Sequence, residues 1–118
     1  MSKLVEFDKD SPDWLLCPNC RELNLHHDKV TIFDRDREDA PSTALEIEDK
    51  RVRTIDDAKG NPSSRRHGLA IRFWCECCDV ISELTIAQHK GITMVEWRYV
   101  GRELRELPIT DFSVRVGN

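Results

Sequence analysis

The five cysteines carry the clearest chemistry in this sequence. Four of them form two CxxC pairs, Cys17-Pro18-Asn19-Cys20 and Cys75-Glu76-Cys77-Cys78, and one thiol is left over. Zn²⁺ prefers four tetrahedral ligands, and two intervening residues let a tight turn place both sulfurs of a pair about 2.3 Å from the same ion. The sequence therefore predicts one structural zinc site, with the ligands Cys17, Cys20, Cys75 and Cys78.

Other uses of these thiols are less favoured. The odd number of cysteines argues against a disulfide framework. A thioredoxin-like redox site needs its CxxC at the start of a helix in a βαβ unit, and no helical periodicity follows Cys20 or Cys78. A catalytic zinc ion keeps one coordination position open, whereas four thiolates fill all of them. Cys77 is interpreted as a small packed residue, and no histidine is assigned to the metal.

Two tryptophans stand near the cysteine pairs. Trp14 precedes Cys17 by three residues, and Trp74 is adjacent to Cys75. An indole in such a position can shield the thiolates from water. We therefore expect both tryptophans to pack at the metal, in preference to stacking on nucleic-acid bases.

The elements that must position these turns read as strands. Apolar and polar residues alternate over 68–73, 80–86 and 93–99, which is the pattern of half-buried strands. His89-Lys90-Gly91 supplies a turn between the last two of them. The pattern predicts a three-stranded antiparallel meander that hangs from the second cysteine turn. Residues 23–32 are expected to form one or two strands, with a turn or bulge near His27-Asp28.

A charged insertion, residues 34–66, separates the two cysteine pairs. Of its 33 residues, 17 are charged. A two-residue turn at Asp49-Lys50 would form a hairpin that sets Glu46 against Arg53 and Glu48 against Arg51. A helix is the alternative, because Glu46 to Lys50 is a favourable four-residue pair, but the β-branched residues of 52–55 disfavour it.

The whole chain is expected to form a single domain, residues 1–118. Residues 1–13 are expected to be a flexible N-terminus, 102–107 fit one helical turn that ends at Pro108, and Phe112, Val114 and Val116 suggest a last edge strand. The predicted fold is mainly β: a zinc ribbon with an antiparallel β-meander, an inserted charged hairpin and at most one short C-terminal helix.

Size and charge exclude several classes of protein. The chain has 118 residues and a net charge of −4, so it is too short for a large enzyme and lacks the basic excess of a general nucleic-acid coat protein. No segment has the long apolar core of a signal peptide or a membrane span. We therefore expect a cytoplasmic protein that does not enter a membrane.

The cysteine pairs, each feeding a β-hairpin, resemble the zinc ribbon superfamily over roughly residues 14–32 and 68–100. Three short segments are also similar to small uncharacterised bacterial and bacteriophage proteins: Gly60-Asn61-Pro62-Ser63, Arg65-Arg66-His67-Gly68 and Gln88-His89-Lys90-Gly91. Zinc ribbons often carry glycine after the second cysteine of each turn, whereas Arg21 and Asp79 stand at those positions here. The resemblance implies a binding module held by a structural zinc ion, without naming an activity.

Two functions follow as hypotheses. The favoured one is a protein-interaction adaptor, which would use the edge strand of the charged insertion to bind a protein partner or a second copy of the chain. The alternative is a nucleic-acid-binding zinc ribbon, whose contacts would be Arg65, Arg66, His67, Lys90 and Arg98. An enzyme is not expected, because the sequence has no glycine-rich phosphate loop and no nucleophile elbow, and thiol redox activity is the minor enzymatic alternative.

Overall fold

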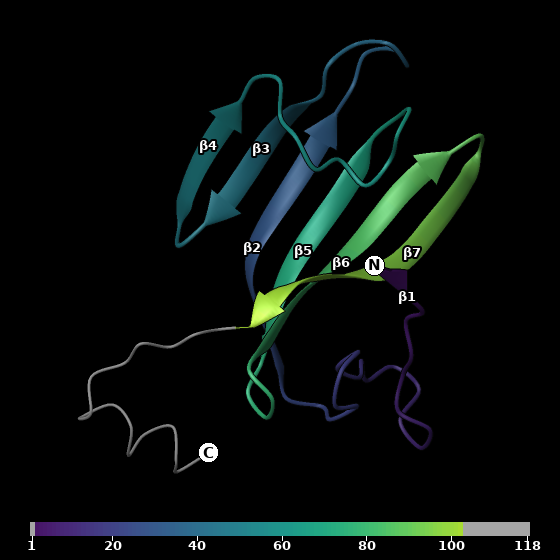
Figure 1. Cartoon of the computed structure of the whole chain (residues 1–118), viewed down its shortest axis with the longest axis vertical. Coiled ribbons are helices and arrows are strands. Elements are labelled where there is room, and N and C mark those ends of the chain that lie inside the picture. Colours follow the sequence, from purple (N-terminus) through teal and green to yellow (C-terminus); the bar gives the residue numbers. More distant parts are fainter. Residues whose placement is uncertain (1, 103–118) are drawn as a thin grey trace.

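The computed structural model describes residues 2–102, which form one antiparallel sheet of seven strands (Figure 1). The strands lie side by side in the order β1-β7-β6-β5-β2-β3-β4. Their bounds are β1 Ser2–Lys3, β2 Leu25–Asp34, β3 Thr43–Glu48, β4 Arg51–Ile55, β5 Gly68–Cys75, β6 Val80–His89 and β7 Ile92–Arg102. Over residues 2–102 there is no helix, and hence none that could cross a bilayer. The mainly β fold is as predicted, while the predicted C-terminal helical turn and last edge strand lie outside the described residues.

The predicted meander is formed by β5, β6 and β7. His89 pairs with Ile92, so the connection between β6 and β7 is the two residues Lys90 and Gly91. Both residues have positive φ, 51° and 81°, as a type I′ hairpin turn requires. Glycine adopts this conformation without strain, which explains why the turn falls here.

The strand that follows the first cysteine pair is one continuous strand, β2. A register shift between His27 and Lys29 marks a bulge, so of the turn or bulge expected near His27-Asp28 the structure has the bulge. β2 pairs with β5 on one side and with β3 on the other. Leu25, at its start, lies opposite Cys75, at the end of β5, so this pairing brings the two cysteine turns to the same end of the sheet.

The charged insertion contains the predicted hairpin, formed by β3 and β4. Its turn is Asp49-Lys50, and both residues have positive φ. Glu46 lies opposite Arg53, and their side chains form an ion pair of 2.6 Å. Glu48 lies opposite Arg51 as predicted, but its carboxylate accepts a 2.8 Å hydrogen bond from Arg72 of β5. The hairpin is therefore joined to the central sheet through side chains as well as through β2.

The strand registers sort the side chains onto two unlike faces. The apolar face carries two rows of six residues, contributed by β4, β3, β2, β5, β6 and β7 in that order. The rows are Val52, Ile47, Val30, Ile71, Leu84 and Trp97, then Thr54, Leu45, Ile32, Leu69, Ile86 and Val95. The opposite side, the charged face, includes Arg51, Arg53, Glu46, Glu48, Lys29, Arg72, Glu83, Glu96 and Arg98. Alternation along each strand therefore separates apolar from charged side chains across the sheet.

A small core lies on the charged side, beneath the connection between β4 and β5. Phe33, Ala44 and Ala70 project from three strands, and Ala58 of the connection packs against them. At the start of β5 the same connection touches Gly68, where a Cβ atom would lie 2.3 Å from Asn61 Oδ1. The connection therefore covers the end of the sheet that is opposite to Cys75.

Candidate metal centre

The four paired cysteines come together at one end of the sheet. Cys17 and Cys20 lie in the segment before β2, whereas Cys75 ends β5 and Cys78 directly precedes β6. In sequence 54 residues separate Cys20 from Cys75. The pairing of β2 with β5 brings the two cysteine pairs together in space. The hydrogen bonding continues one residue past the strands, where Glu76 N donates to the carbonyl of Asn24 at 2.9 Å.

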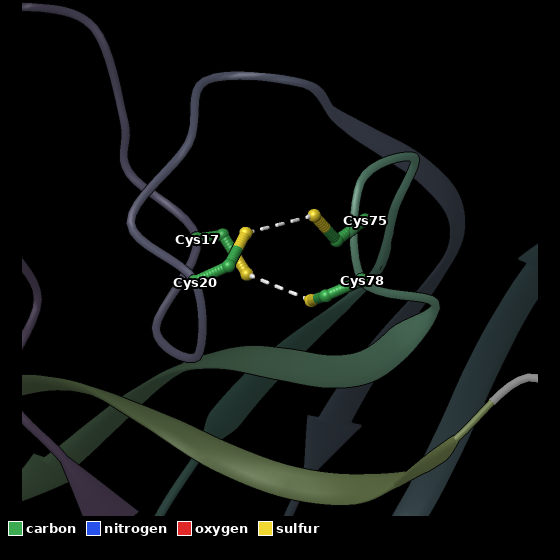
Figure 2. Close-up of side chains that lie close together, drawn as sticks. All are labelled: Cys17, Cys20, Cys75 and Cys78. Atoms are coloured by element: carbon green, nitrogen blue, oxygen red, sulfur yellow. Dashed lines mark hydrogen bonds between the residues drawn. The ribbon is translucent and has the colours of Figure 1, made fainter. Parts of the chain in front are cut away.

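The sulfur geometry fits a single tetrahedral ion (Figure 2). All four Sγ atoms lie within 4.8 Å of one another. The Sγ atoms of Cys20 and Cys75 are 3.5 Å apart, and those of Cys17 and Cys78 are 3.8 Å apart. Four thiolates each about 2.3 Å from a central ion would be separated by about 3.8 Å. The described residues therefore position these four cysteines to hold a metal ion.

The two cysteine turns have the same backbone geometry. Arg21 N donates to the Cys17 carbonyl at 3.0 Å, and Asp79 N donates to the Cys75 carbonyl at 2.9 Å. Arg21 and Asp79 both have positive φ, 66° and 62°. In zinc ribbons these positions are often glycine, which adopts positive φ easily. Here Arg21 and Asp79 adopt the same left-handed conformation although neither is glycine.

Burial and hydrogen bonds give the thiols different pKa values. Cys17 and Cys75 are buried, with exposed fractions of 1% and 0%. Burial raises the pKa of Cys75, and it also raises the pKa of Cys20. At Cys78 burial acts in the same direction, but hydrogen bonds from the Asn19 side chain and the Val80 amide outweigh it and lower the pKa to about 7. Without a metal, Cys78 is therefore the thiol that ionises most readily among these three.

Cys77 corrects one expectation from the sequence. It was expected to be a small packed residue, but its side chain is exposed. Its Sγ accepts a 3.2 Å hydrogen bond from Asn24 Nδ2, so it helps to tie the second turn to the exit of the first. Cys77 lies within a tight turn, and the cysteines at the two ends of that turn, Cys75 and Cys78, belong to the sulfur cluster, which leaves the Cys77 side chain on the outside.

One of the two tryptophans near the cysteine pairs differs from expectation. The Trp14 side chain is 53% exposed, so it is not packed as a metal shield should be. Trp74 stacks on His26, with ring centroids 4.5 Å apart. The packed tryptophan is Trp97, which is 1% exposed and meets Phe73 edge-on at 5.5 Å. Alternation over 93–99 would have identified Trp97 as inward-facing, whereas proximity to a cysteine in sequence singled out the other two.

Cationic groups lie around the two turns. Lys3 Nζ donates to the Pro18 carbonyl, and Arg102 Nη1 donates to the Cys78 carbonyl at 2.8 Å. Arg21 forms an ion pair with Glu6. A metal bound by four thiolates carries a net charge of −2, so Lys3 and Arg102 lie where they would offset it.

The residues predicted to contact nucleic acid are only partly brought together. Four of them, Arg65, Arg66, His67 and Lys90, line one depression of about 360 Å³. Glu38 lies in the same depression and pairs with Arg65 at 2.9 Å and with Arg66 at 3.5 Å. The fifth, Arg98, pairs with Glu83 on the charged face at 2.6 Å. Because His67 precedes the start of β5 and Cys75 ends it, the depression lies far from the cysteine cluster.

The donor set limits what this centre can do. Four thiolates from two turns suit Zn²⁺ or iron, and they leave no coordination position for a substrate or an activated water. The cluster is therefore a candidate structural metal site, and the metal's identity is not fixed by the sulfurs alone. Comparisons of the chain with models of protein families, with curated proteins and with solved structures find no match.

Proposed function

We propose that this chain is a structural zinc module of the zinc ribbon type. The observation that carries the proposal is the sulfur cluster, with its two separations of 3.5 and 3.8 Å and its two matching turns. Four thiolates close the coordination shell, which supports a structural role and gives no support for catalysis at the metal. The ion would clamp the segment before β2 to the turn between β5 and β6.

The small core supports a structural role for the metal. Ten hydrophobic residues are buried among those the structure describes, but four are alanines and two are the cysteines Cys17 and Cys75. Sheets of this kind gain little from such side chains, whereas structural zinc contributes about 10 kcal/mol or more at neutral pH. Zinc binding is therefore proposed to supply much of the folding free energy.

Metal analysis tests the first part of this proposal. Protein purified without chelators should contain one zinc ion per chain by elemental analysis, and Co²⁺ exchange should give the visible spectrum of a tetrahedral thiolate site. The matched variants are Cys20→Ser, which removes a ligand, and Cys77→Ser, which removes an exposed thiol outside the cluster. Zinc should be lost only from Cys20→Ser. Iron in place of zinc, or equal loss from both variants, would contradict the proposal.

The proposed role of the module is to bind a protein partner. Two surfaces support it: the outermost strand, β4, has a free edge among the described residues, and the apolar face carries large exposed hydrophobic side chains. Contiguous apolar patches on small proteins mark interaction sites. Capture of host proteins by the zinc-loaded chain, compared with Leu45→Thr/Ile47→Thr, tests this role. A captured set that is the same for both proteins would argue against the apolar face.

Nucleic-acid binding is the alternative function. It is favoured by the gathering of Arg65, Arg66, His67 and Lys90 in one depression, and opposed by the pairing of both arginines with Glu38. Binding to single-stranded and duplex DNA and RNA should be measured over a salt series. Affinity that falls steeply with salt and is lost in Arg65→Gln/Arg66→Gln would establish this function. Weak binding with no salt dependence would remove it.

A further inference from the structure

The apolar face of the described sheet is a feature that the metal site does not explain. Five of its side chains, in four different strands, are between 37% and 64% exposed: Val52, Val95, Ile32, Ile47 and Leu45. Cross-strand pairing makes them part of two continuous rows across β4, β3, β2, β5, β6 and β7. Eleven of the twelve residues in these rows are apolar, and the exception is Thr54. Isolated exposed hydrophobic residues need no explanation, but an ordered patch of this kind does.

The other side of the sheet has a different composition. On the charged face Glu46 pairs with Arg53 and Lys29, Glu48 pairs with Arg72, and Glu83 pairs with Arg98. These charged side chains therefore have partners within the chain, and Phe33, Ala44 and Ala70 of the same face are covered by the connection between β4 and β5. The charged face is thus satisfied within the chain by ion pairs and by its own small core, whereas the two apolar rows include five exposed hydrophobic side chains that the described residues leave uncovered.

We propose that the apolar face packs against the same face of a second copy of this chain, forming a two-sheet sandwich. This deepens the proposed function, because it rests on the protein-interaction role and names the partner. Sheets pack face to face about 10 Å apart with strands inclined by about 30°, and a twofold axis through the patch would set each row against its counterpart. The twelve residues include no charged side chain, so two copies meet without like-charge repulsion.

The size of the patch suits a dimer that forms reversibly. Six strands about 4.8 Å apart span roughly 29 Å, and two rows take up roughly 14 Å along the strands, giving roughly 400 Å² per copy. A pair of copies would bury at most roughly 800 Å², which is the size of a weak, transient interface and below the roughly 1,200 Å² of a stable one. Trp97 is already buried, so it adds little new area.

One border of the patch, at the end away from the cysteines, is polar and internally paired, whereas His27, Phe73, Ser82 and Tyr99 line the border toward the cysteines. Asp34 forms an ion pair with His67 at 2.9 Å, and Gln88 donates a 2.9 Å hydrogen bond to Thr93. Both pairs lie just beyond the second row, next to its members Ile32, Ile86 and Val95. Because these polar groups have partners in the single chain, closing a second copy over the patch leaves them satisfied. An apolar centre within a polar rim is the usual arrangement of a protein interface.

Sedimentation equilibrium of the full zinc-loaded chain, from micromolar to submillimolar concentration, tests the dimer. The wild-type mass should rise from one chain to two. Leu45→Thr/Ile47→Thr should raise the dissociation constant at least about tenfold, because apolar contacts are lost in both copies. Met94→Thr is the matched control: Met94 is 39% exposed, like Leu45 and Ile47, but lies on the charged face opposite Ala87. It should leave the dissociation constant unchanged.

A further variant guards against misfolding. Val52→Thr changes one side chain on the edge strand β4, is strand-compatible and should also weaken the dimer. A zinc-loaded wild type that stays a single chain at every concentration overturns the dimer and leaves the proposed function standing, with another protein or the segment after Arg102 as the occupant. A dimer unchanged in both face variants also overturns it, because the copies then meet elsewhere. A dimer that these variants dissociate in a protein without zinc supports the dimer and removes the metal proposal.

Discussion

Removing the metal should unfold the sheet as a whole, and the expected size of the effect follows from the small core. Of the buried hydrophobic residues that the structure describes, only Leu16, Phe33, Val80 and Trp97 are large and are not cysteines. Full burial of such side chains contributes about 1.5–3 kcal/mol each, so together they supply about 6–12 kcal/mol. Structural zinc contributes about 10 kcal/mol or more, and small domains have a net stability of about 5–15 kcal/mol. Loss of the metal therefore removes a free energy comparable with the whole stability.

Thermal unfolding with and without a strong chelator measures this loss. Trp97 reports it directly, because its buried indole would become solvated and its emission would shift to longer wavelength. We expect the cooperative transition to disappear on chelation and to return when Zn²⁺ is added back. Cys17→Ser should behave like the chelated protein, and Cys77→Ser should melt like the wild type. A chelated protein with the same midpoint and the same tryptophan emission would refute the conclusion that metal binding supplies the folding energy.

Three further predictions concern proton linkage, a close packing contact and an ion pair. Zinc affinity should fall by at least about 100-fold for each unit by which the pH is lowered near neutral pH. The raised pKa values of Cys20 and Cys75 mean that zinc binding releases at least two protons. Competition with a zinc indicator measures the affinity, and an affinity that does not change with pH would contradict the prediction. Gly68→Ala should lower the free energy of unfolding by about 1–3 kcal/mol in denaturant titrations, because its Cβ would meet Asn61 and Pro62, whereas Gly101→Ala, with open space at Cβ, should not. Glu46→Gln should cost about 0.5–1 kcal/mol at neutral pH. The hydrogen bond from Arg53 lowers the pKa of Glu46, so this stability is present above the unfolded-state pKa and is lost as pH falls through the folded-state pKa; an equal cost at acidic pH would rule out the ion pair.

Local signals in the sequence were sufficient for several elements. The β6–β7 turn, the β3–β4 hairpin and the bulge in β2 were each predicted, because turn residues and alternation act over a few residues. The clustering of the four cysteines was predicted for a different reason. Two CxxC pairs in one small chain have few other uses, and the metal's preferred geometry fixes their relation without regard to the distance between them.

Features that depend on long-range pairing could not be read in this way. The pairing of β1 with β7 joins residues at opposite ends of the described chain, and no local pattern indicates it. Trp97 lines a depression together with Pro18 and Asn19, which are distant in sequence. The separation of Arg98 from the other basic candidates depends on the sheet face that it occupies. Alternation in each strand was visible, but the agreement of all the registers, which creates one apolar and one charged face, appears only when the strands are assembled.

The neighbouring positions of β2 and β5 have a consequence for how this chain can vary. The segment between these strands, which includes β3 and β4, starts after Asp34 and ends before Gly68, and these two residues lie beside each other at the end opposite the sulfur cluster. Its length enters the closure entropy only logarithmically. Residues added at the exposed Asp49-Lys50 turn are therefore expected to leave the clamp unchanged and the small core around Phe33 and Ala44 in place.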